Sequence, residues 1–276
     1  MRVPRYVEVE TSRYCNRLCE WCPNHPLGDR KEQELLPWPA LERIVQSLAR
    51  AEYGGWFAFH NYNEPLANPR IVEELSFVRA ALPLARPTIY TNGDRLTSGL
   101  YGALMRAGLV QMRVTIYPEK RKAQVPSHTA LRRWLRRRPF LAELSWDEVD
   151  VRQGAALLHT GSPEIILISP RVEGYYDRGG TIPWLSMEMR TAPCLLTSNS
   201  LSIDYRGNIK MCCNVVTGSA AHQEYLLGNV PEDDVLEVWN SKAFESVRAR
   251  HARSDWDKTP ICRTCKQELK QVSHGA

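Results

Sequence analysis

The run Cys15-Asn16-Arg17-Leu18-Cys19-Glu20-Trp21-Cys22 decides how this sequence is interpreted. Its three cysteines follow a C-x3-C-x2-C spacing, directly after Tyr6 to Glu10, where apolar and polar residues alternate as in a strand. Thiolates are the usual ligands of iron–sulfur clusters, and a cubane cluster held by three protein sulfurs has one iron open for another ligand. The alternatives are a zinc site lacking its fourth ligand, with His25 as the nearby candidate, and three unrelated buried thiols.

The motif, its position after the first strand and the sequence that follows resemble the radical S-adenosylmethionine (SAM) superfamily. In that family the open iron chelates S-adenosylmethionine, and one electron from the cluster yields a 5′-deoxyadenosyl radical that abstracts hydrogen from the substrate. The resemblance implies that Cys15, Cys19 and Cys22 hold a SAM-binding [4Fe–4S] cluster. It also implies that Trp21 shields the cluster or contacts adenine.

The composition is that of an ordinary soluble globular protein: 276 residues, 43% hydrophobic and 24% charged, with a net charge of +5. The sequence has neither a run of about 18 apolar residues nor a long apolar N-terminal signal segment, so we expect a cytoplasmic protein with no membrane partner. Eight cysteines in such a chain indicate metal ligands or reactive thiols in preference to disulfides.

The stretch from Leu131 to Phe140 contains five arginines and predicts a helix with a basic face. A solvated helix surface is the preferred interpretation, because nothing else in the chain resembles an RNA-binding motif and nucleic acid is therefore an unlikely partner. The alternatives are a nucleic-acid contact and a contact with an anionic group of a substrate or redox partner.

The first two thirds of the chain alternate β-rich runs with helical patterns, which is typical of a parallel sheet with crossover helices. The predicted strands are Tyr6 to Glu10, Trp56 to His60, Thr88 to Thr91, Val110 to Tyr117, a strand near Glu148 to Arg152, and Glu164 to Ser169. The predicted helices between them include Pro37 to Tyr53, Asn68 to Leu82 and Thr97 to Ala107. About six strands are too few for a closed eight-stranded barrel. We therefore predict an α/β fold whose residues 1–180 form an open, partial (β/α)6 barrel with its site at the strand carboxyl ends.

Polar residues follow three of the predicted strands. The segment Asn61-Tyr62-Asn63-Glu64-Pro65 comes where the superfamily has Gly-Gly-Glu-Pro, whose backbone carbonyls receive the ammonium of S-adenosylmethionine. Both glycines are replaced here, and an ordinary Asn/Pro turn is the alternative. The resemblance implies cofactor contacts from Asn61, Tyr62, Asn63 and Glu64, with Glu64 paired to the ammonium. Tyr62 and Asn61 are also candidates for contact with substrate hydroxyls.

Two further strand ends resemble family segments beside the cofactor. Thr91 and Asn92, in Tyr90-Thr91-Asn92-Gly93, resemble the family's Thr-Asn-Gly segment. Thr115 stands where family members often have a serine near the ribose or carboxylate. The resemblance therefore adds Thr91, Asn92 and Thr115 to the expected cofactor-binding residues.

A second set of cysteines lies downstream, at Cys194, Cys212, Cys213, Cys262 and Cys265. The sequence from Leu201 to Cys213 predicts a β-hairpin with its turn at Arg206-Gly207-Asn208, which returns Cys212 toward Cys194. Four thiolates from this set would suit zinc or a second iron–sulfur cluster.

The layout of residues 181–276 resembles the Twitch, or shortened SPASM, extension of radical SAM enzymes: a cysteine, a hairpin, a second cysteine, a Gly-Asn segment, a helix with Val238-Trp239-Asn240, and a Cys-x2-Cys pair. The resemblance implies one auxiliary [4Fe–4S] cluster held by Cys194, Cys212, Cys262 and Cys265. Cys213 is then spare, and its S–H bond is a candidate hydrogen donor to a substrate radical. A small buried hydrophobe, or exchanged roles between Cys212 and Cys213, are the alternatives.

Arg178 lies in the polar junction Gly174 to Gly180, after the last predicted barrel strand. Its planar guanidinium is suited to vicinal hydroxyls or a carboxylate, so Arg178, Glu64 and Cys213 are the predicted catalytic residues. A surface linker with an internal salt bridge is the alternative.

The architecture resembles small Twitch-type enzymes that modify sugars and aminocyclitols in antibiotic biosynthesis. The spare Cys213 favours epimerisation of a hydroxyl-bearing carbon, and the first alternative is a dehydrogenase that oxidises a secondary alcohol through the auxiliary cluster. A peptide-modifying SPASM-type maturase and a zinc-stabilised binding protein are further alternatives. The implied partners are a small sugar or aminocyclitol substrate and flavodoxin or a similar one-electron reductant.

Overall fold

A mixed sheet organises the computed structural model, which describes residues 1–27, 32–117, 127–151, 155–161, 164–170, 175–185 and 188–266. Within those residues the sheet has ten strands in the order β10-β9-β8-β1-β2-β3-β4-β7-β6-β5. The strands are β1 (Tyr6–Val9), β2 (Trp56–Ala58), β3 (Arg86–Thr91), β4 (Gln111–Thr115), β5 (Asp147–Val151), β6 (Ala155–His159), β7 (Glu164–Ser169), β8 (Ser200–Ile203), β9 (Asn208–Lys210) and β10 (Leu226–Asn229).

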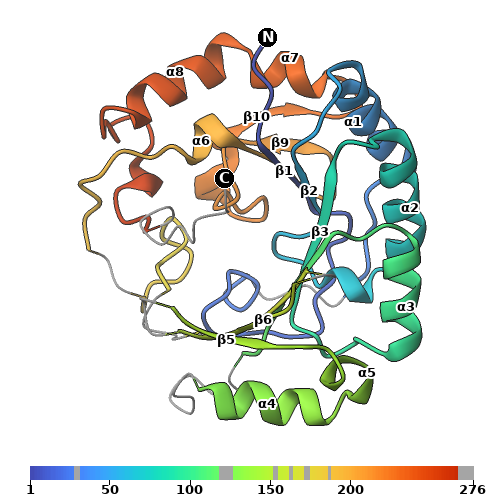
Figure 1. The fold of residues 1–276 in the computed structure, drawn as a ribbon. Coiled ribbons are helices and arrows are strands. Elements are labelled where there is room, and N and C mark those ends of the chain that lie inside the picture. Colours follow the sequence, from blue (N-terminus) through green and yellow to red (C-terminus); the bar gives the residue numbers. More distant parts are fainter. Residues whose placement is uncertain are drawn as a thin grey trace.

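Helices lie outside the curved sheet, where α1, α2 and α3 follow one another along one side of the molecule (Figure 1). The helical segments are α1 (Trp38–Arg50), η1 (Pro65–Ala67), α2 (Ile71–Ala81), α3 (Ser98–Arg106), α4 (His128–Arg136), α5 (Pro139–Ala142), α6 (Leu196–Asn199), η3 (Ala220–Tyr225), α7 (Val235–Trp239), α8 (Lys242–His251) and η4 (Pro260–Cys262). Helix α1 shows why these segments fold as they do, because Leu41, Ile44, Val45 and Leu48 share one buried face.

The central strands β8, β1, β2, β3, β4 and β7 are parallel neighbours in that order. Together with the crossover helices they form the open, partial barrel expected from the sequence. The sixth parallel strand, however, is β8 of the C-terminal extension. The strand expected near Glu148 to Arg152 is β5, which pairs antiparallel with β6. Only residues 152–154 separate β5 from β6, and so short a link permits a hairpin but no parallel crossover.

The basic stretch from Leu131 to Phe140 forms two helices in place of the single helix expected. Helix α4 ends at Arg136 and α5 begins at Pro139. Proline lacks the N–H that would continue α4, and it disfavours helical backbone in the residue before it. Part of the basic face contacts the protein itself, since Arg132 pairs with Glu148 at 2.7 Å.

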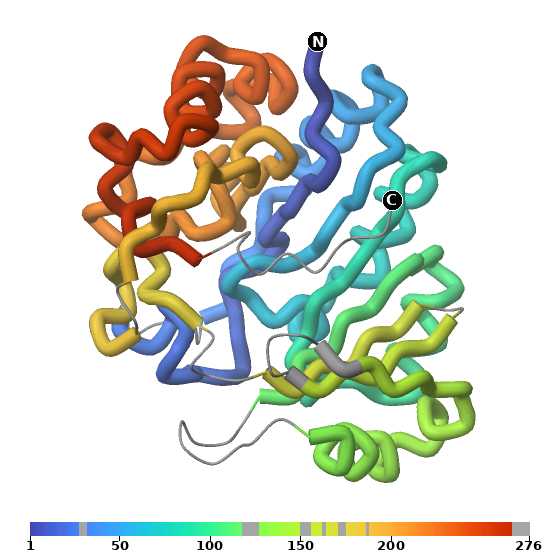
Figure 2. Tube along the Cα trace, turned by 60° about the vertical axis from the view of Figure 1, so that its left-hand side comes forward, coloured from blue at the N-terminus to red at the C-terminus, as the bar shows by residue number. Residues whose placement is uncertain are grey.

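The C-terminal extension continues the sheet on the far side of β1. Strands β8 and β9 form the expected hairpin, with Ile203 opposite Ile209. Gly207 in the turn has φ +82°, and a Cβ there would lie 2.3 Å from the carbonyl oxygen of Val230, so only glycine fits without a backbone shift. Strand β10, which contains Gly228 and Asn229, pairs antiparallel with β9. In Figure 2 the orange and red extension lies beside the dark blue N-terminal strand.

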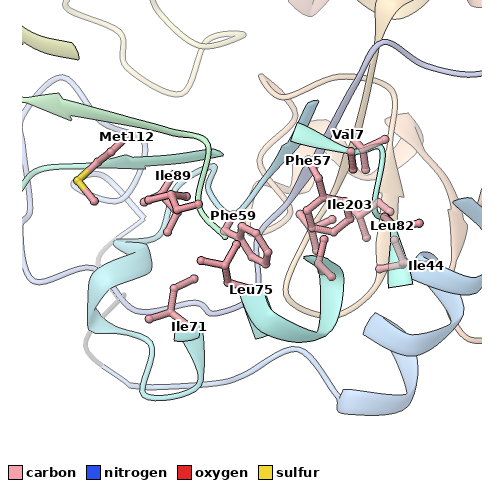
Figure 3. Close-up of a cluster of buried hydrophobic side chains, with 14 of the residues drawn as sticks. Val7, Ile44, Phe57, Phe59, Ile71, Leu75, Leu82, Ile89, Met112 and Ile203 are labelled. Carbon is pink, nitrogen blue, oxygen red and sulfur yellow. The ribbon is translucent and has the colours of Figure 1, made fainter. Parts of the chain in front are cut away.

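One apolar core crosses from the barrel into the extension. Val7 of β1, Phe57 of β2 and Ile203 of β8 are fully buried in the same cluster (Figure 3). Helices α1 and α2 cover this cluster with Ile44 and Leu75, which are also fully buried. The extension is therefore held to the barrel by backbone pairing and by shared apolar packing.

Among the described residues, no helix is both long and apolar enough to cross a membrane.

Candidate active site

A cavity of about 720 Å³ lies at the carboxyl ends of the parallel strands. Its lining combines the N-terminal cysteine loop, the loops after β2 and β3, strand β4 and the C-terminal extension. The predicted site residues that line it are Cys15, Cys19, Trp21, Cys22, Asn61, Tyr62, Asn63, Glu64, Thr91, Asn92, Thr115, Arg178, Cys213 and Cys265. The structure therefore brings residues from both halves of the sequence to one space.

Three thiols of the N-terminal loop share one part of this cavity. The backbone N–H of Cys22 donates to the carbonyl of Cys19 at 2.9 Å, which folds the loop back on itself. Burial, with a smaller contribution from neighbouring thiols, raises the pKa of Cys15 and of Cys19 to about 12. Because burial disfavours the thiolates, positive charge is needed to hold them, and cluster iron supplies such charge. These three soft donors fit an iron–sulfur cluster.

Trp21 closes one side of the cavity. It is 5% exposed, and its ring stacks on Tyr175 with the centroids 6.3 Å apart and an interplanar angle of 4°. Tyr117 lies against the same ring at 6.0 Å. Within the part of the chain that the structure describes, the buried Nε1 of Trp21 has no hydrogen-bond partner, so an indole donor in the cavity lining is unused.

The carboxylate of Glu64 already has hydrogen-bond partners within the protein. Its carboxylate accepts from the hydroxyl of Thr91, from the backbone N–H of Asn92 at 2.8 Å and from that of Leu66 at 3.1 Å. Burial raises the pKa of Glu64 to about 7. The side chain therefore ties the loop after β2 to the end of β3, and a bond to an ammonium group would compete with these contacts.

Asn92 extends this tie to the cysteine loop, because its Nδ2 donates to Oδ1 of Asn16 at 2.9 Å. Arg17 of the same loop pairs with Asp94 at 2.5 Å. The loops predicted to contact the cofactor are thus linked to the loop that contains the three thiols.

A polar network in the cavity was missed from the sequence. Glu8 accepts from Nδ2 of Asn61 and, at 2.9 Å, from the hydroxyl of Ser202. The Oδ1 of Asn61 accepts from Nζ of Lys210 at 3.0 Å. Burial raises the pKa of Glu8, while the nearby Lys210 opposes that shift. One signal was available: alternation places Glu8 on the opposite face of β1 from the core residue Val7, and in a barrel that face is the interior.

His60 and Tyr62 complete the polar side of the cavity. His60 lies with Nδ1 3.7 Å from Glu8 and Nε2 2.8 Å from the hydroxyl of Tyr6. Burial lowers the pKa of His60 to about 3, so the ring is neutral at pH 7. The hydroxyl of Tyr62 is buried and has no hydrogen-bond partner among the described residues, which leaves it available to a bound molecule.

The four downstream thiols expected as auxiliary ligands are all buried, and Cys265 among them lines the cavity. Cys194, Cys212 and Cys262 belong to one buried cluster. Cys265 is also buried. Burial is the main cause that raises the pKa of Cys212 and of Cys262, and the nearby Cys265 thiol adds to both shifts. The donor set, four sulfurs shielded from water, fits an iron–sulfur cluster.

Cys213 lines the cavity and also packs against the buried cluster that contains Cys194, Cys212 and Cys262. Burial raises its pKa well above the ordinary value, and Glu8 raises it further, so the side chain is a protonated thiol at neutral pH. None of the eight cysteines forms a disulfide.

Among the described residues, no three His, Cys, Asp or Glu side chains converge tightly enough to hold a single metal ion. A cubane cluster bonds each cysteine sulfur to a different iron, so its ligands are farther apart than those of one ion.

Arg178 lies between the cavity and the auxiliary thiols. Its Nη1 donates to Oδ1 of Asn214 at 2.6 Å and lies 3.1 Å from the hydroxyl of Tyr176. Asn214 in turn contacts Cys265, with Nδ2 3.5 Å from Sγ. The importance of Asn214 was not visible in the sequence, because neither its neighbours nor its spacing indicates which groups it contacts.

Comparison with known families and proteins agrees with this arrangement. The model of the radical SAM superfamily matches residues 9–138, and that of the SPASM iron–sulfur cluster-binding domain matches residues 194–266. Over 260 residues, the chain is 24% identical to S-adenosyl-L-methionine-dependent 2-deoxy-scyllo-inosamine dehydrogenase of Niallia circulans. That alignment covers 94% of this chain and 91% of the relative.

Solved structures share the fold. The crystal structure of BtrN in complex with AdoMet and 2-DOIA has a TM-score of 0.74 at 23% identity, covering 97% of this chain and 94% of BtrN. BtrN in an open conformation has a TM-score of 0.65 at 20% identity, with coverage of 96% and 92%. Native anSMEcpe with bound AdoMet has a TM-score of 0.55 at 13% identity, with coverage of 95% and 88%.

The two family matches contain all eight cysteines, with the N-terminal triad in the first match and the other five in the second. They account for a radical SAM cluster in the barrel and an auxiliary iron–sulfur cluster in the extension, and exclude the zinc-only interpretation. This chain belongs to the radical SAM superfamily and contains a C-terminal SPASM iron–sulfur domain.

Proposed function

We propose that the protein is a radical SAM dehydrogenase that oxidises a secondary alcohol of an aminocyclitol to a ketone. The observation that carries this proposal is that one cavity is lined both by the N-terminal cysteine triad and by Cys265 of the extension. Support also comes from the Niallia circulans relative, named as a dehydrogenase of 2-deoxy-scyllo-inosamine, and from BtrN, crystallised with 2-DOIA. This order of preference reverses the expectation from the sequence, which favoured epimerisation.

In this proposal Cys15, Cys19 and Cys22 hold the SAM-binding [4Fe–4S] cluster, and Cys194, Cys212, Cys262 and Cys265 hold the auxiliary one. When bound, the first cluster and S-adenosylmethionine would supply a 5′-deoxyadenosyl radical that takes a hydrogen atom from a hydroxyl-bearing carbon. The auxiliary cluster would supply an acceptor for the electron that remains on the substrate. The proposed domains are residues 1–180 and 181–276, with backbone pairing of β8 to β1 across the boundary.

The cofactor contacts proposed for the chain are Trp21, Asn61, Tyr62, Asn63, Thr91, Asn92 and Thr115, all in the cavity lining. Glu64 lines the cavity as well, but its hydrogen bonds to Thr91, Asn92 and Leu66 favour a role in holding these loops. A backbone held in place before binding loses less entropy when the cofactor arrives.

Oxidation of an alcohol also releases a proton from the hydroxyl, and Glu8 is the proposed acceptor. Its carboxylate lines the cavity, and its raised pKa makes it a better base than an exposed glutamate. Arg178, which lines the same cavity, is the proposed donor to the substrate oxygen.

Epimerisation is the second candidate, because Cys213 is a protonated thiol in the cavity lining. In that reaction Cys213 would return a hydrogen atom to the opposite face of the substrate carbon and would need an external one-electron reductant. Flavodoxin or a similar protein is the proposed electron donor in either case.

Anaerobic incubation in deuterated water tests the proposal. Reconstituted protein with S-adenosylmethionine, reductant and 2-deoxy-scyllo-inosamine should yield 5′-deoxyadenosine and a product two hydrogens lighter than the substrate. A product of unchanged composition carrying one solvent deuterium would support epimerisation. Protein that binds S-adenosylmethionine but leaves a panel of aminocyclitols unchanged would contradict the proposed substrate class.

Metal content provides the matched control. Iron and sulfide should correspond to two clusters in the wild-type protein and to one in Cys22→Ala and in Cys265→Ala. Cys22→Ala should also lose the spectral change that S-adenosylmethionine causes, while Cys265→Ala should keep it.

A further inference from the structure

Asn214 forms a direct polar contact with one of the proposed auxiliary ligands. It follows the Cys212-Cys213 pair and is 4% exposed. Its Nδ2 lies 3.5 Å from Sγ of Cys265, a hydrogen-bond length for the large sulfur atom. A buried amide donor therefore faces a sulfur that the proposed function assigns to the cluster.

The orientation of this amide is fixed by its other end. Oδ1 of Asn214 accepts from Nη1 of Arg178 at 2.6 Å and from the hydroxyl of Tyr176 at 2.6 Å. A guanidinium only donates, so the group that faces it must be the amide oxygen. The NH2 group must then face Cys265, and a flipped amide is excluded.

The positive charge of Arg178 strengthens this donor. Its guanidinium is held over the ring of Tyr176, 4.8 Å from the centroid. A cation bonded to the amide oxygen polarises the amide and makes its N–H groups better donors. Arg178 also lines the substrate cavity, so one chain of contacts runs from that cavity to Cys265.

Hydrogen bonds to cluster sulfurs are among the main determinants of reduction potential. A donor to a ligand sulfur stabilises the more negative, reduced state and raises the potential. Oxidation of the alcohol removes one hydrogen atom, one proton and one electron, and the last passes to the auxiliary cluster. A higher potential favours that transfer.

We propose that Asn214, oriented by Arg178 and Tyr176, is a positioning residue that raises the reduction potential of the auxiliary cluster through its hydrogen bond to Cys265. The inference rests on two parts of the proposed function: Cys265 is a ligand of the auxiliary cluster, and that cluster accepts the electron.

Potentiometric titration of the full-length holoenzyme, followed by electron paramagnetic resonance, tests this directly. Asn214→Leu removes the donor at similar volume, and Asn214→Asp keeps the acceptor for Arg178 while replacing the donor with an anionic oxygen. Both should lower the midpoint potential of the auxiliary cluster by about 59 mV or more, which for one electron is a tenfold change in the equilibrium constant. Tyr176→Phe, which leaves the contact with Cys265 intact, is the matched control and should shift the potential less.

Product ratios provide a second measurement. Asn214 does not line the cavity in which hydrogen abstraction is proposed, so Asn214→Leu should form more 5′-deoxyadenosine per molecule of ketone than the wild type. Variants with full iron content and an unshifted midpoint potential would overturn this inference but leave the proposed function standing. If Asn214→Leu loses the cluster, Asn214→Asp decides the question. Wild-type protein without a second cluster would overturn the proposed function together with the inference.

Discussion

The hydroxyl of Ser202 donates to Oε1 of Glu8 at 2.9 Å, although the two residues are 194 positions apart. Both are buried, and they are register partners in the parallel pairing of β8 with β1. The C-terminal extension therefore helps to orient a carboxylate in the cavity of the barrel. A cluster domain attached only by a linker would not reach this group.

Replacing Glu8 should slow the oxidation. Glu8→Gln keeps the shape and an acceptor for Asn61 but removes the base, so ketone formation should fall by about 10²-fold or more, the usual contribution of general base catalysis. Cleavage of S-adenosylmethionine without substrate should not change. The measurement is the initial rate of each product under anaerobic conditions.

Ser202→Ala is the matched control, because it removes one hydrogen bond to Glu8 and leaves the carboxylate. Its rate should fall less than that of Glu8→Gln. If Glu8→Gln turns over at a rate near wild type, Glu8 does not accept the proton.

Loss of the hydroxyl group should affect stability at Tyr53 and substrate binding at Tyr62. The hydroxyl of Tyr62 is buried without a partner in the described ranges of the chain, whereas that of Tyr53 donates to the carbonyl of Trp56 at 2.6 Å. Tyr53→Phe should lower the free energy of unfolding by about 1 kcal/mol. Tyr62→Phe should not destabilise the substrate-free protein but should raise KM.

Chemical denaturation and steady-state kinetics of the two variants provide the comparison. Equal destabilisation by Tyr53→Phe and Tyr62→Phe would mean that the hydroxyl of Tyr62 has a partner within the folded protein.

Cys213→Ala separates oxidation from epimerisation. A dehydrogenase does not need the Cys213 thiol, so the variant should form ketone within a few-fold of the wild-type rate and keep its full iron content. Cys212→Ala, the matched control, should lose the auxiliary cluster and the ketone together. Loss of all turnover in Cys213→Ala, with both clusters present, would instead support hydrogen donation by this thiol.

His60 should make stability sensitive to acid. Burial lowers its pKa in the folded protein to about 3, against about 6.5 when unfolded, so its contribution is present above pH 6.5 and is lost as the pH falls toward 3. The loss is about 1.4 kcal/mol per pH unit within that range. The groups that face His60 are Glu8, Tyr6, Tyr90, Arg113 and Lys210.

Urea unfolding of wild type and His60→Gln at pH 7.0 and pH 5.5 measures this effect. Glu8, whose pKa is raised, changes stability in the opposite direction in both proteins, so the difference between them isolates His60. Wild type should lose more stability than His60→Gln on acidification, and parallel behaviour would contradict the buried neutral ring.

The barrel could be predicted because its signals are local. Alternating residues mark Tyr6–Val9, helical spacing marks Trp38–Arg50, and the carboxyl ends of parallel strands meet at one edge, so the loops with Cys15 and Asn61 had to be neighbours. The hairpin around Gly207 was predictable for the same reason.

The pairing of β8 with β1 could not be predicted, because strand pairing between distant segments leaves no periodic signal in either one. The hydrogen bonds that Glu64 accepts from Thr91 and Asn92, and the contact of Asn214 with Cys265, depend on such tertiary neighbours as well.

The position of β8 has a consequence for synthesis of the chain. Strand β1 lies between β2 and β8, and β8 begins only at Ser200. At the usual pace of translation, roughly 10 to 40 s pass between β1 and β8 leaving the ribosome. During that time one edge of β1 exposes unpaired backbone groups, a template for aggregation. Nascent chains of this protein should therefore depend on chaperones until the last third has emerged.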